Sequence, residues 1–123
     1  MFRLSEIRNQ NKMPIIERAK ANKQFSHHVY FWLNNTGNAD DTAELIKGLE
    51  KLSAVSAIKT FHIGVPADTY RDVVERGYAV SWLCLFDNPT DQEIYQTHPI
   101  HLTFVEECKH LWSKVIVFDS VSV

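Results

Sequence analysis

The stretch that decides the fold is FSHHVYFWL, residues Phe25–Leu33. It is rich in aromatic and β-branched residues, so it predicts a β-strand. Both alternating sets of its side chains contain large apolar residues, which is typical of a strand covered on both faces. A turn-forming cluster at 34–38 ends the stretch. The sequence therefore predicts a buried first strand over 25–33.

One helix and two strands are predicted after this strand. Asn38 or Asp40 can cap the helix at its positively polarised N-terminal end. The apolar stripe of the helix is formed by Leu45, Ile46, Leu49 and Leu52. Strands are expected over 57–64 and 77–86, and the polar loop 65–76 between them is long for a hairpin.

Proline determines how the second helical region is divided. Asn88 can cap a helix whose first residue is Pro89. Pro99 has no amide N–H and would clash with the carbonyl of Tyr95, so a straight helix cannot continue through it. The elements expected from here on are a helix over 89–97, a second helix over 99–110 and a last strand over 114–120.

The resulting order, β-α-β-β-α-β, is that of the α+β ferredoxin-like fold, an antiparallel four-stranded sheet with the helices on one face. We expect the following residues to share one face and to alternate with an equally apolar set on the other: Tyr30, Trp32, Val80, Trp82, Val115 and Val117. Because the helices cover one face only, another surface must bury the second. Two sheets packed face to face would do so, and the sequence therefore predicts a homodimer that forms a dimeric α/β barrel.

Composition and charge exclude several classes of protein. The chain has 123 residues, of which 45% are hydrophobic, and a net charge of −2, as in a single globular domain. Its first 24 residues carry six Lys or Arg against two Glu. A basic extension over 1–24 could bind a phosphate-rich partner. We interpret it instead as a solvated tail that binds no nucleic acid, because it lacks interleaved aromatic residues. The folded domain is expected to span 25–123.

Several kinds of site and location are also not expected. The sequence has no apolar run of ~18 residues and no stretch that resembles a signal peptide, which predicts a cytoplasmic protein without a membrane partner. Cys84 and Cys108 have no C-x-x-C spacing, so we expect neither a disulfide framework nor a zinc site. His98 and His101 could form half of a metal site, but no acidic partner sits at ligand spacing. Since phosphate-loop and Rossmann motifs are also absent, we expect no metal and no cofactor.

Several segments resemble the stress-responsive A/B barrel (Dabb) family. Members commonly begin with a His followed by an alternating apolar run, as in Ser26–Leu33. The most specific match is Tyr95-Gln96-Thr97-His98-Pro99-Ile100-His101, which resembles the family's Tyr-x-x-His-Pro-x-His element. Weaker matches are Phe61-His62-Ile63-Gly64, Gly77-Tyr78, Trp112 and Phe118-Asp119-Ser120. The resemblance covers about residues 25–121 and implies a dimeric α/β barrel, but not one function: most members are uncharacterised, some are stress-induced in plants, and some polyketide cyclases share the domain.

Tyr95, His98 and His101 lie three residues apart around Pro99. On a regular helix this spacing puts side chains on one face. A neutral imidazole can take a proton near pH 7, and a phenol can orient or donate one. The resemblance implies that the catalytic pair of cyclising members corresponds to Tyr95 and His101. The alternative is structural: His98 caps the second helix, and the other two make hydrogen bonds at the barrel mouth.

A ligand cavity is expected inside the barrel. His28 alternates with Tyr30 and Trp32, so it should point inward, either to position a ligand or to satisfy a buried polar partner. The residues expected to line the cavity are His28, Tyr30, Trp32, Val80, Trp82 and His98. The sequence departs from cyclising members at Val80 and the bulky Trp82, which predicts a smaller or differently shaped cavity.

Two functions are compatible with these residues. In the first, the homodimer binds a small, mostly apolar or aromatic ligand and carries out cofactor-independent, cyclase- or lyase-type acid–base chemistry through His101 and Tyr95. In the second, the protein is a non-enzymatic stress-response or interaction module whose barrel is filled by Tyr30, Trp32 and Trp82. A cavity that exposes the Tyr95 hydroxyl and the His101 imidazole would favour the first, and a filled barrel would favour the second.

Overall fold

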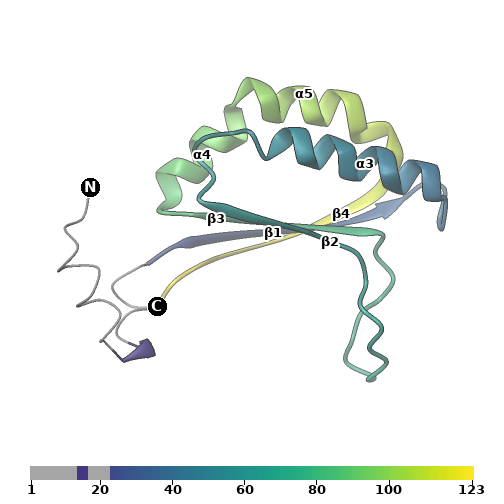
Figure 1. Ribbon diagram of the computed structural model, residues 1–123, viewed down its shortest axis with the longest axis horizontal. Coiled ribbons are helices and arrows are strands. Elements are labelled where there is room, and N and C mark those ends of the chain that lie inside the picture. The colour runs from purple at the N-terminus through teal and green to yellow at the C-terminus, as the bar shows by residue number, and fades with distance from the viewer. Residues whose placement is uncertain (1–13, 17–22) are drawn as a thin grey trace.

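The computed structural model describes residues 14–16 and 23–123, so most of the basic extension expected over 1–24 lies outside the described residues. The elements follow the order βαββαβ, with the second helical region divided in two (Figure 1). The strands are β1 (Phe25–Leu33), β2 (Thr60–Gly64), β3 (Val80–Phe86) and β4 (Trp112–Val121). The helices are α3 (Ala39–Leu52), α4 (Pro89–Thr97) and α5 (Pro99–Cys108), the last followed by the short 3₁₀ turn η1 (Lys109–Leu111).

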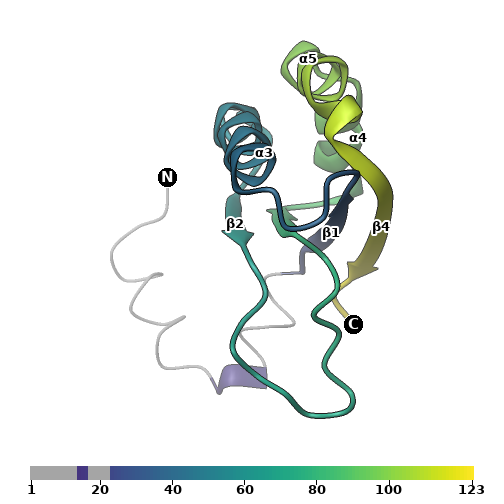
Figure 2. The same cartoon turned by 90° about the vertical axis from the view of Figure 1, so that its right-hand side faces the viewer.

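The strands form one antiparallel sheet in the order β2-β3-β1-β4, and the three helices lie on the same face of it (Figures 1 and 2). The first strand is therefore flanked by a strand on each side. It pairs with β3 on one side and β4 on the other, so that Val29 lies opposite both Trp82 and Val117. This arrangement is the ferredoxin-like fold predicted from the sequence.

Polar side chains begin the helices at the predicted positions. Asn38 and Asn88 each accept a hydrogen bond from the backbone N–H three residues further on, at 2.9 Å and 2.8 Å. His98 separates α4 from α5, because its backbone is extended and its Nδ1 accepts a hydrogen bond from the Ile100 backbone N–H at 3.0 Å. Pro99 is then the first residue of α5, which confirms the predicted helix break.

The hydrophobic core lies between the helices and the sheet face that they cover. From α3, Leu45, Leu49 and Leu52 are fully buried, as the predicted apolar stripe requires. The strand residues that meet the helices are Val29, Phe31 and Leu33 of β1 and Val80, Trp82, Cys84 and Phe86 of β3. One face of the sheet is therefore buried within a single chain.

The expectation that Val80 and Trp82 share a face with Tyr30 and Trp32 is wrong. Residues directly opposite one another on paired strands point to the same face of a sheet. Trp82 lies opposite Val29, and Val80 alternates in phase with Trp82, so both point to the helices. Tyr30 and Trp32 point the other way. Both sets are apolar, so the residue types alone did not determine the phase of the alternation.

The helices leave the second face of the sheet uncovered (Figure 2). We call it the open face; the side chains that point to it include His28, Tyr30, Trp32, His62, Leu83, Leu85, Ile116 and Phe118. Val115 and Val117, which we expected here, point instead to the helix side, since Val117 lies opposite Val29. Phe118 is 63% exposed in the single chain. A second apolar face is thus present, as the sequence predicted, although with different members.

A long loop, residues 65–79, joins β2 to β3. It extends away from the sheet on the side opposite to the helices (Figures 1 and 2). The two strands begin three residues later than expected, at Thr60 and Val80. Ala57 and Ile58, assigned to the strand from their apolar character, pack instead against the core from an irregular segment. The loop is therefore longer than the predicted range 65–76.

Candidate functional site

Three ring side chains form a cluster between the sheet and the helices: His27 of β1, Tyr95 of α4 and His101 of α5. The Tyr95 ring is close to both of the others, with its centre 5.6 Å from that of His27 and 4.8 Å from that of His101. The helix break at Pro99 places Tyr95 and His101 on separate helices and still brings their rings together. The predicted pairing of Tyr95 with His101 is thus present in the structure as a contact.

The Tyr95 hydroxyl is buried and already hydrogen bonded. The side chain is 1% exposed, and its oxygen accepts a hydrogen bond from the Trp82 Nε1–H at 3.0 Å. Burial raises the pKa of Tyr95 well above its usual value of 10, with a smaller contribution from Cys84. The phenol therefore stays protonated, and it can orient a neighbouring group or donate a hydrogen bond.

His101 has the chemistry of a general base. Its Nδ1 is buried and has no hydrogen-bond partner among the residues that the structure describes. Burial lowers the pKa of His101 below its usual 6.5; the charge of His27 acts in the same direction, whereas the Gln96 backbone opposes it. A neutral imidazole with an unpaired nitrogen can accept a proton. An unsatisfied buried nitrogen is costly in a purely structural role.

His27 is the residue that the sequence interpretation missed. It is buried, and its Nδ1 lies 2.6 Å from Oδ1 of Asp119, directly opposite on β4. A carboxylate oxygen accepts hydrogen bonds, so the His27 Nδ1–H donates this one. The interpretation chose His28 instead, although His27 alternates with Val29 and Phe31. Asp119 could have identified His27 as a functional residue, but its position opposite His27 is known only from the register of β1 and β4.

His28 lies on the open face, away from this cluster. Its Nδ1 is 3.2 Å from the Tyr30 hydroxyl, and the two rings are 4.4 Å apart. Burial lowers the pKa of His28, and His62 and His27 contribute in the same direction. The predicted cavity residues are thus divided between two faces: His28, Tyr30 and Trp32 lie on the open face, Val80 and Trp82 lie in the core, and His98 caps α5.

Two apolar hollows of similar volume flank the sheet and the helix layer. One, of about 360 Å³, lies on the open face and is lined by Tyr30, Trp32, Glu75, Tyr78, Lys114, Ile116 and Phe118. In it, Lys114 Nζ is 4.5 Å from the centre of the Trp32 ring. The other, of about 320 Å³, lies between α3 and α5 and includes Gly48, Leu52, Ile100 and Phe104. Neither hollow is lined by Tyr95 or His101.

Metal ligands do not gather in the part of the chain that the structure describes: over 14–16 and 23–123, no three His, Cys, Asp or Glu side chains are placed to hold an ion. Cys84 and Cys108 are free and buried. Over the same residues, no helix is both long and apolar enough to cross a membrane.

Comparison with known proteins agrees with this architecture. A relative from Arabidopsis thaliana, a stress-response A/B barrel domain-containing protein, is 25% identical over 100 residues, covering 80% of this chain and 86% of its own length. A dimeric ferredoxin-like protein of unknown function from Thermobifida fusca superposes with a TM-score of 0.66 at 18% identity, covering 83% of this chain and 92% of that one. The hydroxynitrile lyase of Passiflora edulis gives 0.68 at 17% identity, with 83% and 95% covered. The family model of the stress responsive A/B barrel domain matches residues 25–122, and the chain belongs to this family.

Proposed function

We propose that this protein is a homodimeric barrel that binds a small, mostly apolar ligand and carries out cofactor-independent proton transfer, with His101 as the general base. The observation that carries the proposal is the buried His101 Nδ1 without a hydrogen-bond partner. Nearly all buried polar atoms in folded proteins are paired, so an unpaired one next to a tyrosine and a second histidine favours a site whose partner is a ligand.

The neighbours of His101 support acid–base chemistry. Tyr95 stays protonated and lies against the His101 ring, where it can orient a substrate oxygen. His27, held by Asp119, supplies a second imidazole next to Tyr95. Two histidines and a phenol in an apolar enclosure can remove a proton at one atom and return it at another without a cofactor. The same fold carries a lyase in Passiflora edulis, so the architecture is compatible with such reactions.

Ligand entry requires a movement at the corner between α4 and α5. Tyr95 is 1% exposed, and neither hollow described above reaches it. The corner at His98–Pro99 joins the two helices through one extended residue, so the helices can separate there without breaking a continuous helix. We infer that a ligand displaces α5 slightly from the sheet and meets His101 first.

The open face supports the proposed homodimer. Phe118 on this face is exposed in a single chain, and Ile116 beside it is only partly buried. A second copy packed face to face would bury both open faces and form the barrel. Structural neighbours of the same fold are dimeric, as in Thermobifida fusca.

The second candidate is the non-enzymatic module with a filled core. It is favoured by the hydrogen bond from Trp82 to Tyr95, which uses the tyrosine oxygen for packing. In this case the α4–α5 corner stays closed, and His101 only packs against Tyr95. The two candidates differ in whether small molecules reach His101.

A ligand screen by NMR distinguishes the two functions. The homodimer, labelled with ¹⁵N in its histidine rings, is titrated with small aromatic aldehydes and with mandelonitrile, and the His101 and His110 signals are followed. The proposal predicts selective shifts at His101 and cleavage of mandelonitrile or a related carbonyl adduct above the solvent rate. His101→Ala should lower that rate by about 10²-fold or more, whereas His110→Ala, on the exposed turn η1, should not. No shift at His101 with any probe would favour the filled core.

A further inference from the structure

We propose that the loop over residues 65–79 is an arm that clasps the second copy of the chain, with Tyr70 and Val73 as its contact residues. The inference rests on the proposed homodimer and adds a contact region outside the open face. The proposed contact surface is a loop whose apolar side chains are largely exposed in the single chain.

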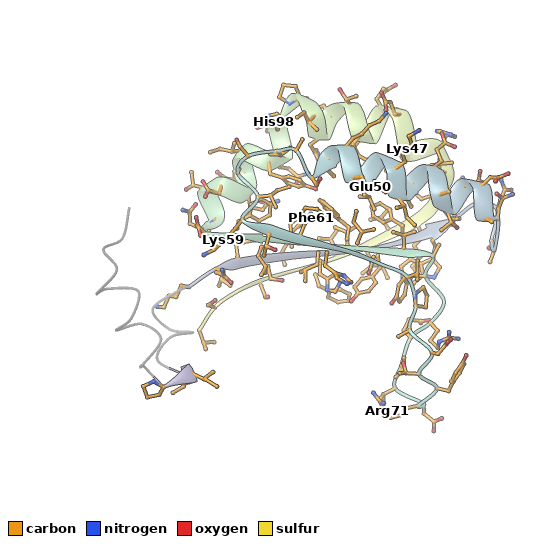
Figure 3. All side chains as sticks on the ribbon, viewed as in Figure 1. Lys47, Glu50, Lys59, Phe61, Arg71 and His98 are labelled. Carbon is orange, nitrogen blue, oxygen red and sulfur yellow. The ribbon has the colours of Figure 1, made fainter. Side chains whose placement is uncertain are left out.

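The position of the loop favours contact with a second copy. It leaves the sheet from the ends of β2 and β3 and extends past the open face, on the side opposite to the helices (Figures 1 and 2). Arg71 marks its far end, whereas Lys47 and Glu50 lie on the opposite side of the molecule, on α3 (Figure 3). A second copy seated on the open face must therefore lie beside the inner surface of this loop.

The loop carries large apolar side chains that are exposed in the single chain. Val73 is 89% exposed and Tyr70 is 75% exposed in the single chain, although neither a valine nor a tyrosine is typical of a solvated loop tip. Valine and tyrosine gain free energy when they are removed from water, and tyrosine is enriched in protein interfaces. Among the residues that the structure describes, Arg76 lies over one face of the Tyr70 ring, and both side chains otherwise remain largely exposed, so we assign their further cover to the partner.

The loop is organised before it meets a partner. The Arg76 Nε–H donates to the Ala67 carbonyl at 2.8 Å, and the Arg76 guanidinium lies 4.4 Å from the centre of the Tyr70 ring. Asp68 accepts from both the Tyr70 hydroxyl, at 3.3 Å, and Arg76, at 3.5 Å. These contacts connect residues 67–70 to Arg76 across the loop. A preorganised arm loses less conformational entropy on binding than a disordered one.

The base of the loop is attached to the open face. The Tyr78 ring packs edge to face against Tyr30 at 4.9 Å and against Trp32 at 6.3 Å. Glu75 accepts a hydrogen bond from the Gly77 backbone N–H at 2.7 Å, which closes the last turn before β3. The direction in which the arm projects is therefore determined by the same aromatic residues that the second copy would cover. In a two-fold dimer each copy contributes one arm, so every contact occurs twice.

Photocrosslinking between isotopically distinct copies tests the clasp. The full chain is made with a photoreactive phenylalanine analogue at Val73, once in ¹⁴N and once in ¹⁵N medium, and the two preparations are mixed to exchange subunits. We expect cross-linked peptide pairs that combine light and heavy chains. The control carries the same analogue at Lys47, on the outer side of α3, and should give no mixed pairs. Cross-links from position 73 confined to single chains would overturn the proposal.

A matched pair of double variants gives an independent measurement. Tyr70→Ser with Val73→Ser removes apolar surface from the arm, and Ile94→Ser with Leu102→Ser removes it from the exposed helix side, where these residues are 49% and 57% exposed. We expect the dimer dissociation constant, from sedimentation equilibrium, to rise at least about tenfold for the arm variant only, because each contact is lost twice. A dimeric parent whose arm variant dimerises equally well contradicts the clasp and leaves the dimer intact. A monomeric parent contradicts both.

Discussion

The imidazole of His27 and the carboxylate of Asp119 lie 2.6 Å apart and connect the first strand of the sheet to the last. The two residues are direct cross-strand partners on the helix side of the sheet. Their contact holds the first of three rings, and Tyr95 and His101 follow at ring-centre distances of 5.6 Å and 4.8 Å. The cluster therefore depends on sheet register at one end and on the helix break at Pro99 at the other.

Replacing Asp119 should loosen this end of the cluster. Asp119→Asn removes the charge that holds His27, and we expect a loss of about 1 kcal/mol in unfolding free energy, because the carboxylate is nearly half exposed and screened by solvent. Urea denaturation measures the loss. Glu107→Gln serves as the control, since its pair with Lys51 is exposed and 3.9 Å long, and it should unfold like the parent. Equal stability of all three proteins would mean that His27 needs no partner.

The stability of the protein should fall in mild acid because of His101. Its pKa is lowered in the folded state, so the unfolded chain binds a proton more readily. Above the ordinary pKa of 6.5, His101 is neutral in both states and does not lower the unfolding free energy. As the pH falls from 6.5 to the lower pKa of the folded state, protonation of the unfolded chain reduces the unfolding free energy. Denaturation curves between pH 7.5 and 5 should show this slope, reduced in His101→Leu and unchanged in His110→Gln. Part of the slope should persist in His101→Leu, because burial lowers the pKa of His28 as well.

The hydrogen bond between Trp82 and Tyr95 should appear as a coupling energy. Trp82→Phe leaves the Tyr95 hydroxyl without its donor and opens space in the core, at a cost of about 2–4 kcal/mol. Tyr95→Phe should cost less, since it removes only the hydroxyl. Tyr95→Phe also removes the hydroxyl that Trp82→Phe leaves unpaired. The double variant should therefore lose about 1 kcal/mol less unfolding free energy than the two single variants lose together. Strict additivity in a urea-based double-mutant cycle would show that the two side chains act independently.

Charge on the open face should prevent dimerisation. Light scattering at micromolar concentration should give twice the chain mass of 14.2 kDa for the parent. Phe118→Glu should lower the mass or unfold the protein, because a carboxylate would be buried between the two sheets. Leu102→Glu is the matched control on the outside of α5 and should remain dimeric. A dimer that tolerates Phe118→Glu would place the interface elsewhere.

The local signals in the sequence were sufficient for the elements and their order. Asn38 and Asn88 cap helices because their side chains replace missing backbone partners, and Pro99 divides a helix because it has no N–H. The apolar run at 25–33 predicted a strand with two apolar faces. The pairing of Tyr95 with His101 was expected from the spacing around Pro99 and from the family resemblance. All of these depend on residues close to one another in the chain.

Only the tertiary structure decided which side of the sheet each strand residue faces. In β1 and β3 both alternating sets are apolar, so a shift of one residue exchanges two equally hydrophobic faces and leaves no signal in composition. For this reason Val80 and Trp82 belong to the core, and His27, not His28, lies beside Tyr95. His27 and Asp119 are 92 positions apart in the sequence, and only the pairing of β1 with β4 brings them into contact.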